Sequence, residues 1–496
     1  MSATTGMQPP IHFGTDGWRG VIADEFTFAR LTAIAPVAAR VLADTFGAST
    51  SSNTVVVGYD RRFLSPEFAK SVADSLCAAG FDVQLAQSFA PTPAFSWAAY
   101  NQKALGALVI TASHNPPAYS GLKIKGAFGG SVAPAITKQV ESILNNANSN
   151  APEARSPGKL TVFDPWASYC EELRSKVDLA AIRKAILNGE LVVFTDVMHG
   201  AAATGLEQIL EIPSDRSGAP SGLKEINASA DPLFGGNSPE PLPRYIQELL
   251  RQMRAYRAEH PQQLLVGFVF DGDSDRIAAV DGDGNFLSTQ NLIPILLEHL
   301  SQRRGLQGEF IKTISGSDLM PRVAALYGLP VYETPVGFKY VADRMLAGDK
   351  VLLGGEESGG IGYSTHIPER DALLSALYLL EALALTKQDL SQLYRDLQVK
   401  TGFFSHYDRI DKHLSSLEAK NRLVQYLQAT PLQEIDGRKV VDVNAIDGFK
   451  FRLEDDSWLL VRFSGTEPVL RLYCEAATSE IVDRTLAWIS NWVEQF

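Results

Sequence analysis

The stretch LVGFVFDGDSDRIAAVDGDGNFLS, residues 265–288, places a short apolar run directly before three closely spaced aspartates. A continuous apolar run of this length is typical of a strand that is buried on both faces of a parallel sheet. The segment after the aspartates, IAAVDGDGNFLS, carries a DG-rich turn between two short apolar runs and predicts a hairpin. The stretch therefore predicts a buried strand, an acidic loop and a hairpin in succession.

Two other apolar runs also end in aspartate. TVVVGYD ends at Asp60 and LVVFTD ends at Asp196, and segments of helical period lie between the runs. We therefore expect several α/β units with parallel sheets and, since no short repeat is evident, not a solenoid. After about residue 395 the pattern changes to RKVVDV, GFKFRLE, SWLLVRF and VLRLYCEA, followed by EIVDRTLAWISNWVEQF. These runs predict a small α+β domain with a mostly antiparallel sheet and a final amphipathic helix.

The composition narrows the class of protein. A chain of 496 residues with 45% hydrophobic and 21% charged residues is typical of a soluble protein of about three or four domains. The longest apolar runs fall short of the ~20 residues that cross a bilayer, and no secretory signal is visible. A net charge of −12 argues against a general nucleic-acid or anionic-membrane surface. Three widely spaced cysteines argue against a disulfide framework and favour a cytoplasmic location.

The acidic loop is a candidate metal site. Asp271, Asp273 and Asp275 alternate along the loop, and such spacing can converge three oxygen ligands on one hard cation. An EF-hand is excluded because its sixth position would be Arg276 and its twelfth Gly282. A solvated acidic turn is the alternative, but three adjacent carboxylates repel one another unless a cation binds them. The spacing favours Mg²⁺, which also binds phosphate oxygens, and Arg276 would then contact a phosphorylated ligand.

Ser113 lies in GALVITASHNPPAYSGLKIKG, residues 106–126, where an apolar run enters a turn with two prolines. The GxSxG elbow of serine hydrolases is missing, so we expect a different role, the acceptance of a phosphoryl group by the hydroxyl. Such a step needs a cation and positive side chains, which the aspartate loop and Lys123 would supply. His114 is either a polar turn residue or a proton carrier beside Ser113.

Four further segments carry residues that suit a sugar phosphate. The segment VRFSGTEPVLRLYCEA suits a phosphate site, although the same residues are also typical of an ordinary hairpin turn. GGEESGG suits sugar hydroxyls or a helix cap, while ETPVGFKY and FGTDGWRG suit an anion or a surface loop. The candidate residues in these segments are Arg462, Ser464, Gly465, Thr466, Arg471, Glu356, Ser358, Lys339 and Arg19.

In this order, TASHNPP, DGDSDR, GEESGG and RFSGTEP resemble the motifs of the α-D-phosphohexomutase superfamily, in its phosphoglucomutase/phosphomannomutase branch. FGTDGWRG and VGFKY also match, so the likeness spans nearly the whole chain. The resemblance implies four domains around one cleft, three related α/β domains and a C-terminal α+β domain. We expect them at residues 1–158, 159–286, 287–395 and 396–496, with a polar linker over residues 145–158.

The resemblance also implies roles for residues. Ser113 would carry the phosphoryl group, and an oxygen of that phosphoserine would bind Mg²⁺ together with the three aspartates. Lys123 would be the general acid/base, with Arg19 and His114 beside the transferring group. Arg276 and Lys339 would contact the substrate, and Glu356 and Ser358 would bind sugar hydroxyls. The phosphate that is not being transferred would be bound by Arg462, Ser464, Gly465, Thr466 and Arg471.

The implied reaction interconverts hexose 1-phosphate and hexose 6-phosphate through a hexose 1,6-bisphosphate, with glucose phosphates as the expected pair. Alternatives are a phosphomannomutase, a bisphosphate synthase that uses a donor such as 1,3-bisphosphoglycerate, and a catalytically silent sugar-phosphate-binding protein. Two departures from the family pattern stand out. Ser120 replaces a common Asn near Lys123, and Gly359–Gly360 lacks a His that some relatives have, which argues against an amino sugar. A monomer and a homodimer both remain open.

Overall fold

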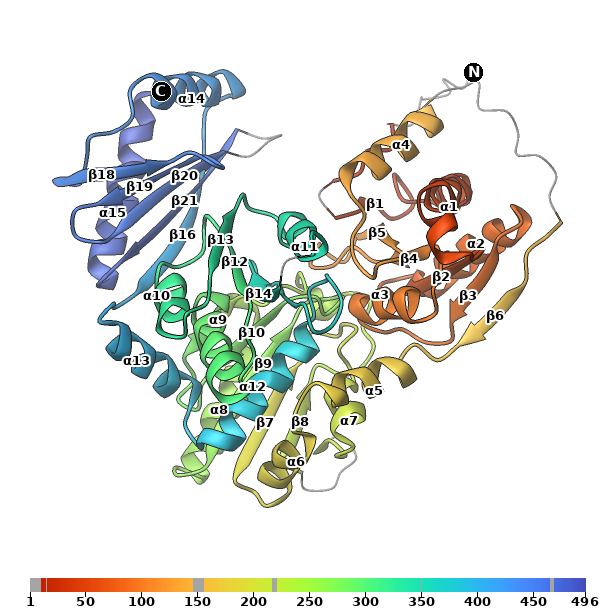
Figure 1. Ribbon diagram of the computed structural model, residues 1–496, viewed down its shortest axis with the longest axis horizontal. Helices are drawn as coiled ribbons and strands as arrows, with labels where there is room; N and C mark the ends of the chain where they lie inside the picture. Colours follow the sequence, from red (N-terminus) through yellow and green to blue (C-terminus); the bar gives the residue numbers. More distant parts are fainter. Residues whose placement is uncertain (1–9, 15, 146–155, 216–220, 349, 464–467) are drawn as a thin grey trace. The chain divides into compact units, whose positions relative to one another are not determined.

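The computed structural model describes residues 10–496 except residues 15, 146–155, 216–220, 349 and 464–467 (Figure 1). The chain forms two compact units. The first comprises Met1–Thr289, Ala342–Asp349 and Ser358–Leu390, and the second comprises Gln290–Val341, Lys350–Glu357 and Ser391–Phe496.

The first unit contains a six-stranded sheet in which the run TVVVGYD forms a central strand. The strands lie in the order β1 (Trp18–Val21), β5 (Tyr119–Gly126), β4 (Gly106–Ile110), β2 (Thr54–Tyr59), β3 (Asp82–Ala86) and β6 (Leu160–Phe163). Strands β4, β2, β3 and β6 are parallel to one another. Strand β5 runs antiparallel to β4, and β1 runs antiparallel to β5. The helices of this region are α1 (Phe28–Thr50), α2 (Ser65–Ala78), α3 (Thr92–Asn101) and α4 (Pro134–Asn145).

Strand β6 begins shortly after the expected linker, residues 145–158. It follows residue 158, yet it pairs in parallel with β3, so this sheet continues past the expected end of the first domain. The four domain boundaries given above stay predictions.

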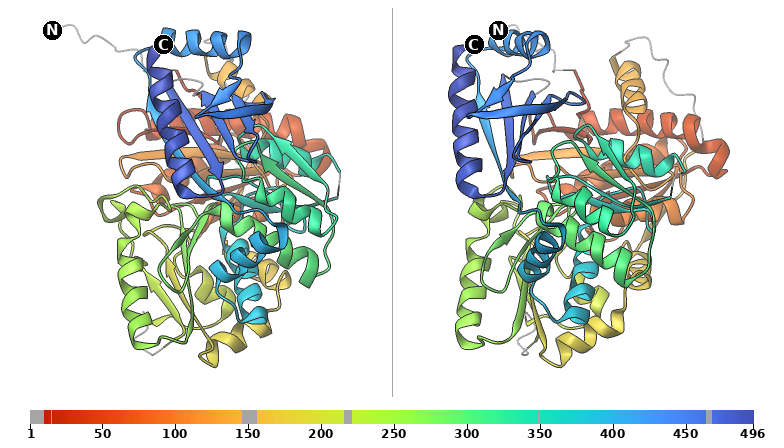
Figure 2. Two further views of the ribbon diagram at one scale, coloured as in Figure 1. Left: turned by 90° about the vertical axis from the view of Figure 1, so that its left-hand side faces the viewer. Right: turned by 60° about the vertical axis from the view of Figure 1, so that its left-hand side comes forward.

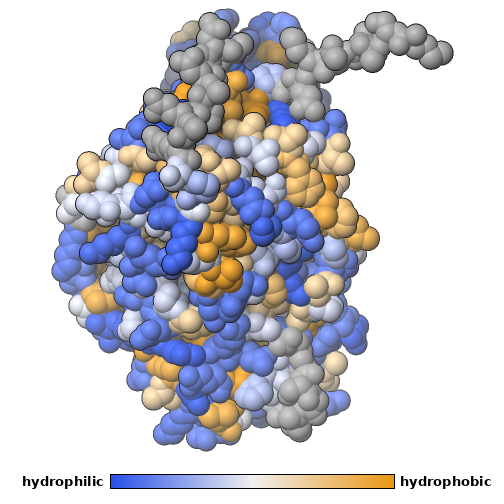
Figure 3. Space-filling view, turned by 90° about the vertical axis from the view of Figure 1, so that its right-hand side faces the viewer, coloured by the Kyte–Doolittle hydropathy of each residue, from blue (hydrophilic) through white to orange (hydrophobic). Residues whose placement is uncertain are grey.

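The sequence predicts no segment long enough to cross a bilayer, but helix α1 is long and apolar enough to do so by length and composition. Its apolar residues have another explanation. Leu31, Ile34 and Leu42 are fully buried in the same hydrophobic core as Val55 and Val57 of β2. The face of the molecule in Figure 3 shows hydrophobic residues in small groups among hydrophilic ones. Helix α1 is thus apolar because one side of it packs in the core.

A second sheet of the first unit contains the stretch LVGFVFD. Its order is β11 (Phe286–Leu287), β10 (Ile277–Val280), β9 (Leu264–Phe270), β7 (Leu191–Asp196) and β8 (Leu223–Ile226). Strands β8, β7 and β9 are parallel, and the expected hairpin is confirmed by the antiparallel pairing of β10 with β11. The other elements are α5 (Ala167–Ser175), α6 (Leu179–Leu187), α7 (Gly205–Leu210), α8 (Gln247–Glu259), β15 (Ile361–Tyr363) and α12 (Ala372–Thr386).

The second unit contains a set of parallel strands and a separate antiparallel sheet (Figure 2). Strand β12 (Glu309–Thr313) pairs in parallel with β13 (Val331–Thr334) and β14 (Val351–Gly355). The antiparallel sheet has the order β16 (His406–His413), β21 (Val469–Ala476), β20 (Trp458–Phe463), β19 (Phe449–Leu453), β18 (Arg438–Asn444) and β17 (Glu434–Ile435). The helices here are α9 (Thr289–Glu298), α10 (Leu319–Leu326), α13 (Leu390–Thr401), α14 (Leu417–Ala429) and α15 (Ser479–Trp492). Helix α11 (Phe338–Leu346) begins in this unit and belongs to the first unit from Ala342 on. The parallel strands with their helices and the antiparallel C-terminal sheet with α14 and α15 confirm the expected α/β and α+β fold class.

A buried histidine joins distant segments of the first unit. The Nδ1 atom of His366 lies 3.2 Å from Glu172 Oε1, and its Nε2 atom lies 3.3 Å from Asp371 Oδ2. The ring stacks on Trp97 of α3, and the hydroxyl of Tyr169 donates to Asp371, which also caps α12. Burial alone would lower the pKa of His366, but hydrogen bonds to Asp371 and Glu172 outweigh burial and raise it.

This raised pKa predicts how stability changes with pH. Protonated His366 stabilises the fold fully below its unfolded pKa of about 6.5, and this contribution is lost as pH rises through the higher folded pKa. The urea midpoint of the wild type should therefore fall more between pH 6 and pH 9 than that of His366→Gln. Equal falls in the two proteins would contradict the assignment.

Candidate active site

Ser113 stands at the carboxyl end of β4 in a strained turn. Its φ of 52° lies in the left-handed region, which costs a non-glycine residue about 1–2 kcal/mol. The backbone N–H of Ser113 donates to Thr111 Oγ1 at 2.9 Å, and the Ser113 side chain is buried. The strand and this turn therefore fix the direction of the hydroxyl.

Arg62 holds the backbone of this turn. Its guanidinium donates to the carbonyl oxygens of Ser113 at 2.6 Å and Asn115 at 2.7 Å. It also donates to the carbonyls of Pro116 at 3.0 Å and Tyr119 at 2.9 Å. Because the Arg62 side chain is fully buried, these four contacts offset the strain at Ser113 and make the turn rigid.

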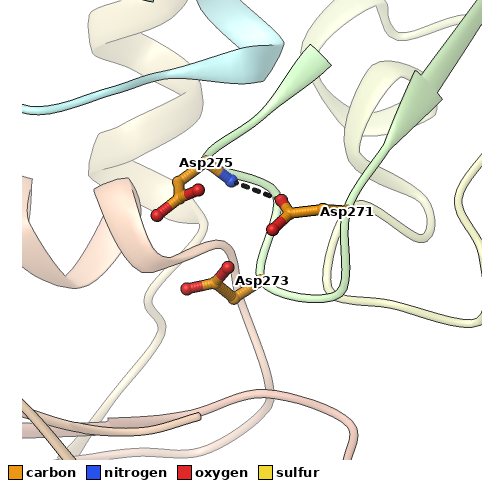
Figure 4. A group of neighbouring side chains, drawn as sticks. All are labelled: Asp271, Asp273 and Asp275. Carbon is orange, nitrogen blue, oxygen red and sulfur yellow. Dashed lines mark hydrogen bonds between the residues drawn. The ribbon is translucent and has the colours of Figure 1, made fainter. Parts of the chain in front are cut away.

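The three predicted metal ligands lie together on the loop after β9 (Figure 4). Asp271, Asp273 and Asp275 are all buried, and one carboxylate oxygen of each lies within 4.8 Å of the others. The backbone N–H of Asp275 donates to Asp271 Oδ1 at 3.1 Å and shapes the loop. Burial, followed by the charges of Asp275 and Asp273, raises the pKa of Asp271 well above its ordinary value. The close approach of the three carboxylates therefore disfavours a negative charge on Asp271.

The chemistry of the triad fits a divalent cation. The Oδ1 atoms of Asp273 and Asp275 are buried and lack a hydrogen-bond partner among the described residues. Buried polar atoms rarely stay unpaired, and carboxylate oxygens are the ligands that Mg²⁺ prefers. The two oxygens thus suit the role of metal ligands.

The Ser113 turn and the aspartate loop are in direct contact. Ser113 Oγ donates to Asp271 Oδ2 at 2.8 Å. A Cβ atom at Gly272 would lie 2.4 Å from the carbonyl oxygen of Ser113, so only glycine permits this approach. The structure therefore brings the predicted phosphoryl acceptor beside the predicted metal ligands.

Lys123 on β5 is fully buried among carboxylates. Its Nζ lies 2.7 Å from Asp273 Oδ2, 3.0 Å from Asp275 Oδ2 and 2.8 Å from Asp16 Oδ2. Burial alone would lower the pKa of Lys123, but these three carboxylates outweigh burial and raise it above the ordinary value. Lys123 is therefore a protonated ammonium in this structure.

His114 and Arg19 lie next to the Ser113 turn. His114 Nδ1 is 3.2 Å from Ser113 Oγ, and Arg19 Nη1 donates to Asn115 Oδ1 at 2.5 Å. Burial, followed by the positive charges of Arg276 and Arg19, lowers the pKa of His114 to about 2. His114 is thus a neutral imidazole at neutral pH and not a second cation.

Arg276 is close to the glycine pair of the predicted sugar loop. Arg276 and Gly360 form an antiparallel bridge, and the N–H of Ile277 donates to the Gly359 carbonyl at 3.0 Å. Ser358 directly precedes this pair. The first unit therefore places the end of the GEESGG segment beside the aspartate loop.

The second unit contains the other predicted substrate residues. Arg462 on β20 and Arg471 on β21 are paired residues on adjacent strands. Asp447 Oδ2 accepts from Arg462 Nε at 2.8 Å and from the backbone N–H of Val336 at 3.0 Å. Val336 begins the VGFKY segment, so that segment and the arginine pair lie side by side. Lys339 lies in the first turn of α11, Glu356 is buried after β14, and Ser464, Gly465 and Thr466 lie outside the described residues.

Three charged residues of the site, two of them buried and one partly exposed, were not identified from the sequence. They are Arg62, Asp16 and Arg370, whose Nη2 contacts both Asp16 and Asp275. Asp16 falls within the quoted segment FGTDGWRG, where its neighbours are typical of a surface loop. Arg62 and Arg370 belong to no recognisable motif, so their only signal is a charge beside apolar segments.

Four domain models of one family match most of the chain. They describe the phosphoglucomutase/phosphomannomutase α/β/α domains I, II and III and the C-terminal domain. The matched residues are 10–151, 167–284, 289–400 and 420–490, respectively.

Individual relatives cover almost the full chain. A phosphoglucomutase/phosphomannomutase from Thermococcus kodakarensis is 28% identical, over 94% of this chain and 95% of its own. A probable phosphoglucosamine mutase from Methanothermobacter thermautotrophicus is 29% identical, over 97% and 98%. The crystal structure of a putative phosphomannomutase from Thermus thermophilus is 34% identical, over 98% and 100%, with a TM-score of 0.82.

The triad predicts a stability response to Mg²⁺. Binding at one hundred times the dissociation constant stabilises a folded protein by about 2.7 kcal/mol, so millimolar Mg²⁺ should raise the thermal midpoint. Asp271→Asn keeps the Oδ1 atom that accepts from the loop backbone but loses one ligand charge, and it should abolish most of this rise. Differential scanning fluorimetry with and without Mg²⁺ measures the effect, with Asp74→Asn on α2 as the exposed control. A full Mg²⁺ response in Asp271→Asn would contradict the assignment.

Proposed function

We propose that this chain, which belongs to the phosphoglucomutase/phosphomannomutase family, interconverts glucose 1-phosphate and glucose 6-phosphate, with mannose phosphates as secondary substrates. The single observation that carries the proposal is the contact of Ser113 Oγ with Asp271 at 2.8 Å. It supports a serine that carries a phosphoryl group at the edge of a cation site.

The side chains around Ser113 suit transfer of a phosphoryl group. A Mg²⁺ ion at the triad would neutralise charge on the phosphoryl oxygens when bound. Lys123 supplies a buried positive charge, and Arg19 a second one that its bond to Asn115 holds beside the turn. Neutral His114 adds a polar contact at Ser113 Oγ without adding charge. Phosphoryl transfer depends mainly on such positioning and charge stabilisation.

The first transfer moves the phosphoryl group from Ser113 to the free hydroxyl of a hexose monophosphate. The new bond joins the sugar oxygen to phosphorus, and the bond from phosphorus to Ser113 Oγ breaks. Lys123, as the expected general acid/base, would donate a proton to the departing Ser113 Oγ and accept one from the attacking hydroxyl. The product of this step is a hexose 1,6-bisphosphate.

The second transfer returns the other phosphate to Ser113 after the bisphosphate has reversed its orientation. The enzyme must therefore recognise the sugar and its distal phosphate in two opposed poses. We assign the sugar hydroxyls to Glu356 and Ser358 and the distal phosphate to the segment that begins at Arg462. The pairing of Arg462 with Arg471 supports this assignment, because two guanidiniums on adjacent strands suit a dianion.

The choice of glucose over an amino sugar rests on the two residues after Ser358. Gly359 and Gly360 follow it where some relatives have a histidine, and this departure argues against an amino sugar. One of the relatives carries the name of a probable phosphoglucosamine mutase, so glucosamine phosphates belong in the substrate panel.

A coupled assay tests the proposal. With Mg²⁺ and a trace of glucose 1,6-bisphosphate, the protein should convert glucose 1-phosphate faster than the mannose or glucosamine analogues. Ser113→Ala should abolish conversion, since it removes the only atom that carries the phosphoryl group in this scheme, and intact mass should show no added phosphoryl group. Conversion by Ser113→Ala at the wild-type rate, or faster turnover of a glucosamine phosphate, would contradict the proposal.

A further inference from the structure

Two cations, Lys123 and Arg370, contact the same two carboxylate oxygens, one from Asp16 and one from Asp275 of the aspartate triad. Lys123 Nζ lies 2.8 Å from Asp16 Oδ2 and 3.0 Å from Asp275 Oδ2. Arg370 Nη2 lies 2.6 Å from the same oxygen of Asp16 and 2.7 Å from the same oxygen of Asp275. The four groups therefore form a closed ring in which positive and negative charges alternate.

Asp16 differs from the other carboxylates that contact Lys123. Asp273 and Asp275 belong to the candidate metal site, whereas Asp16 lies outside that triad. A cation at the triad would compete with Lys123 for the charge of Asp273 and Asp275. Among the three carboxylates that contact the ammonium in the described part of the chain, Asp16 is then the one outside the metal site.

Arg370 is held firmly where it meets the ring. The adjacent Glu369 accepts from Lys125 Nζ at 2.5 Å, and Asp371 Oδ1 accepts from the backbone N–H of Leu374 at the start of α12. The Arg370 side chain is 7% exposed, and a guanidinium stays charged at any working pH. Its planar group can hold two carboxylates in fixed directions.

We propose that Asp16 and Arg370 are positioning residues that hold Lys123 Nζ and Asp275 in register for phosphoryl transfer. This inference rests on the proposed function. The ring joins the segment before β1, strand β5, the aspartate loop and the segment before α12. Its closure fixes the expected general acid/base relative to Asp275 through Asp16 and Arg370, which lie outside the aspartate triad. Misplacement of a reacting group by about 1 Å can cost on the order of 10²-fold in rate.

Steady-state kinetics of Asp16→Asn and Arg370→Gln test the inference. Both variants should lower kcat by about 10-fold to 100-fold while KM for glucose 1-phosphate stays within about threefold, because neither residue contacts the sugar. Arg370→Lys keeps the charge and should restore part of kcat. Glu298→Gln on α9 is the matched control, since Glu298 is a buried carboxylate that is likewise paired with two cations, Lys400 and Arg303. It should lower the thermal midpoint and leave kcat unchanged.

Isothermal titration with Mg²⁺ alone gives a readout that does not depend on turnover. The dissociation constant of Asp16→Asn should stay within about threefold of the wild type, because Asp16 is not a metal ligand. Wild-type kcat in both variants would show that the ring is structural only and overturn the inference. A loss of Mg²⁺ binding as large as the loss of kcat would also overturn it. If Asp16→Asn does not fold, the comparison of Arg370→Gln with Arg370→Lys decides. A wild type that binds Mg²⁺ but converts no hexose phosphate overturns the proposed function and this inference together.

Discussion

The burial of three carboxylates within 4.8 Å of one another is the constraint on which the site depends. A buried charge without a partner costs several kcal/mol, so cations must lie close to the triad. Among the described residues, Lys123 and Arg370 contact the triad and Arg276 Nε lies 3.8 Å from Asp275 Oδ1, while the Oδ1 atoms of Asp273 and Asp275 lack a hydrogen-bond partner. Protein cations alone thus do not satisfy the aspartates. This incomplete compensation suits a site that binds both a metal and a transferring phosphoryl group.

The same constraint explains why the Ser113 turn is rigid. A serine beside an acidic cluster must be held there against a strained backbone. Arg62 supplies that restraint through four carbonyl oxygens, and Gly272 lets the two loops touch. The conformation of the turn therefore depends on Arg62, which follows β2, as well as on the prolines of the turn itself.

Local patterns in the sequence predicted the elements and the triad, because both depend on short-range spacing. The run before Asp271 forms β9, the following segment forms the β10–β11 hairpin, and the alternate aspartates converge. Asp16, Arg62 and Arg370 could not be identified in this way. Each is a single charged residue, and its importance arises only when segments far apart in the sequence pack together. Strand β16 escaped prediction for a related reason, since HYDRIDKH carries charges on an exposed strand. The apolar helix α1 shows the reverse case, where composition alone suggests a membrane and packing gives the true cause.

The central claim is that Ser113 transfers its phosphoryl group to a sugar and takes another back within one binding event. Rapid quench of protein labelled with ³²P at Ser113, mixed with unlabelled glucose 1-phosphate and Mg²⁺, tests this claim most directly. The account predicts that label leaves the protein within a single turnover, passes briefly through glucose 1,6-bisphosphate and ends in glucose 6-phosphate while the protein regains unlabelled phosphate. Label that stays on the protein during net conversion, or that accumulates in free bisphosphate, would contradict it.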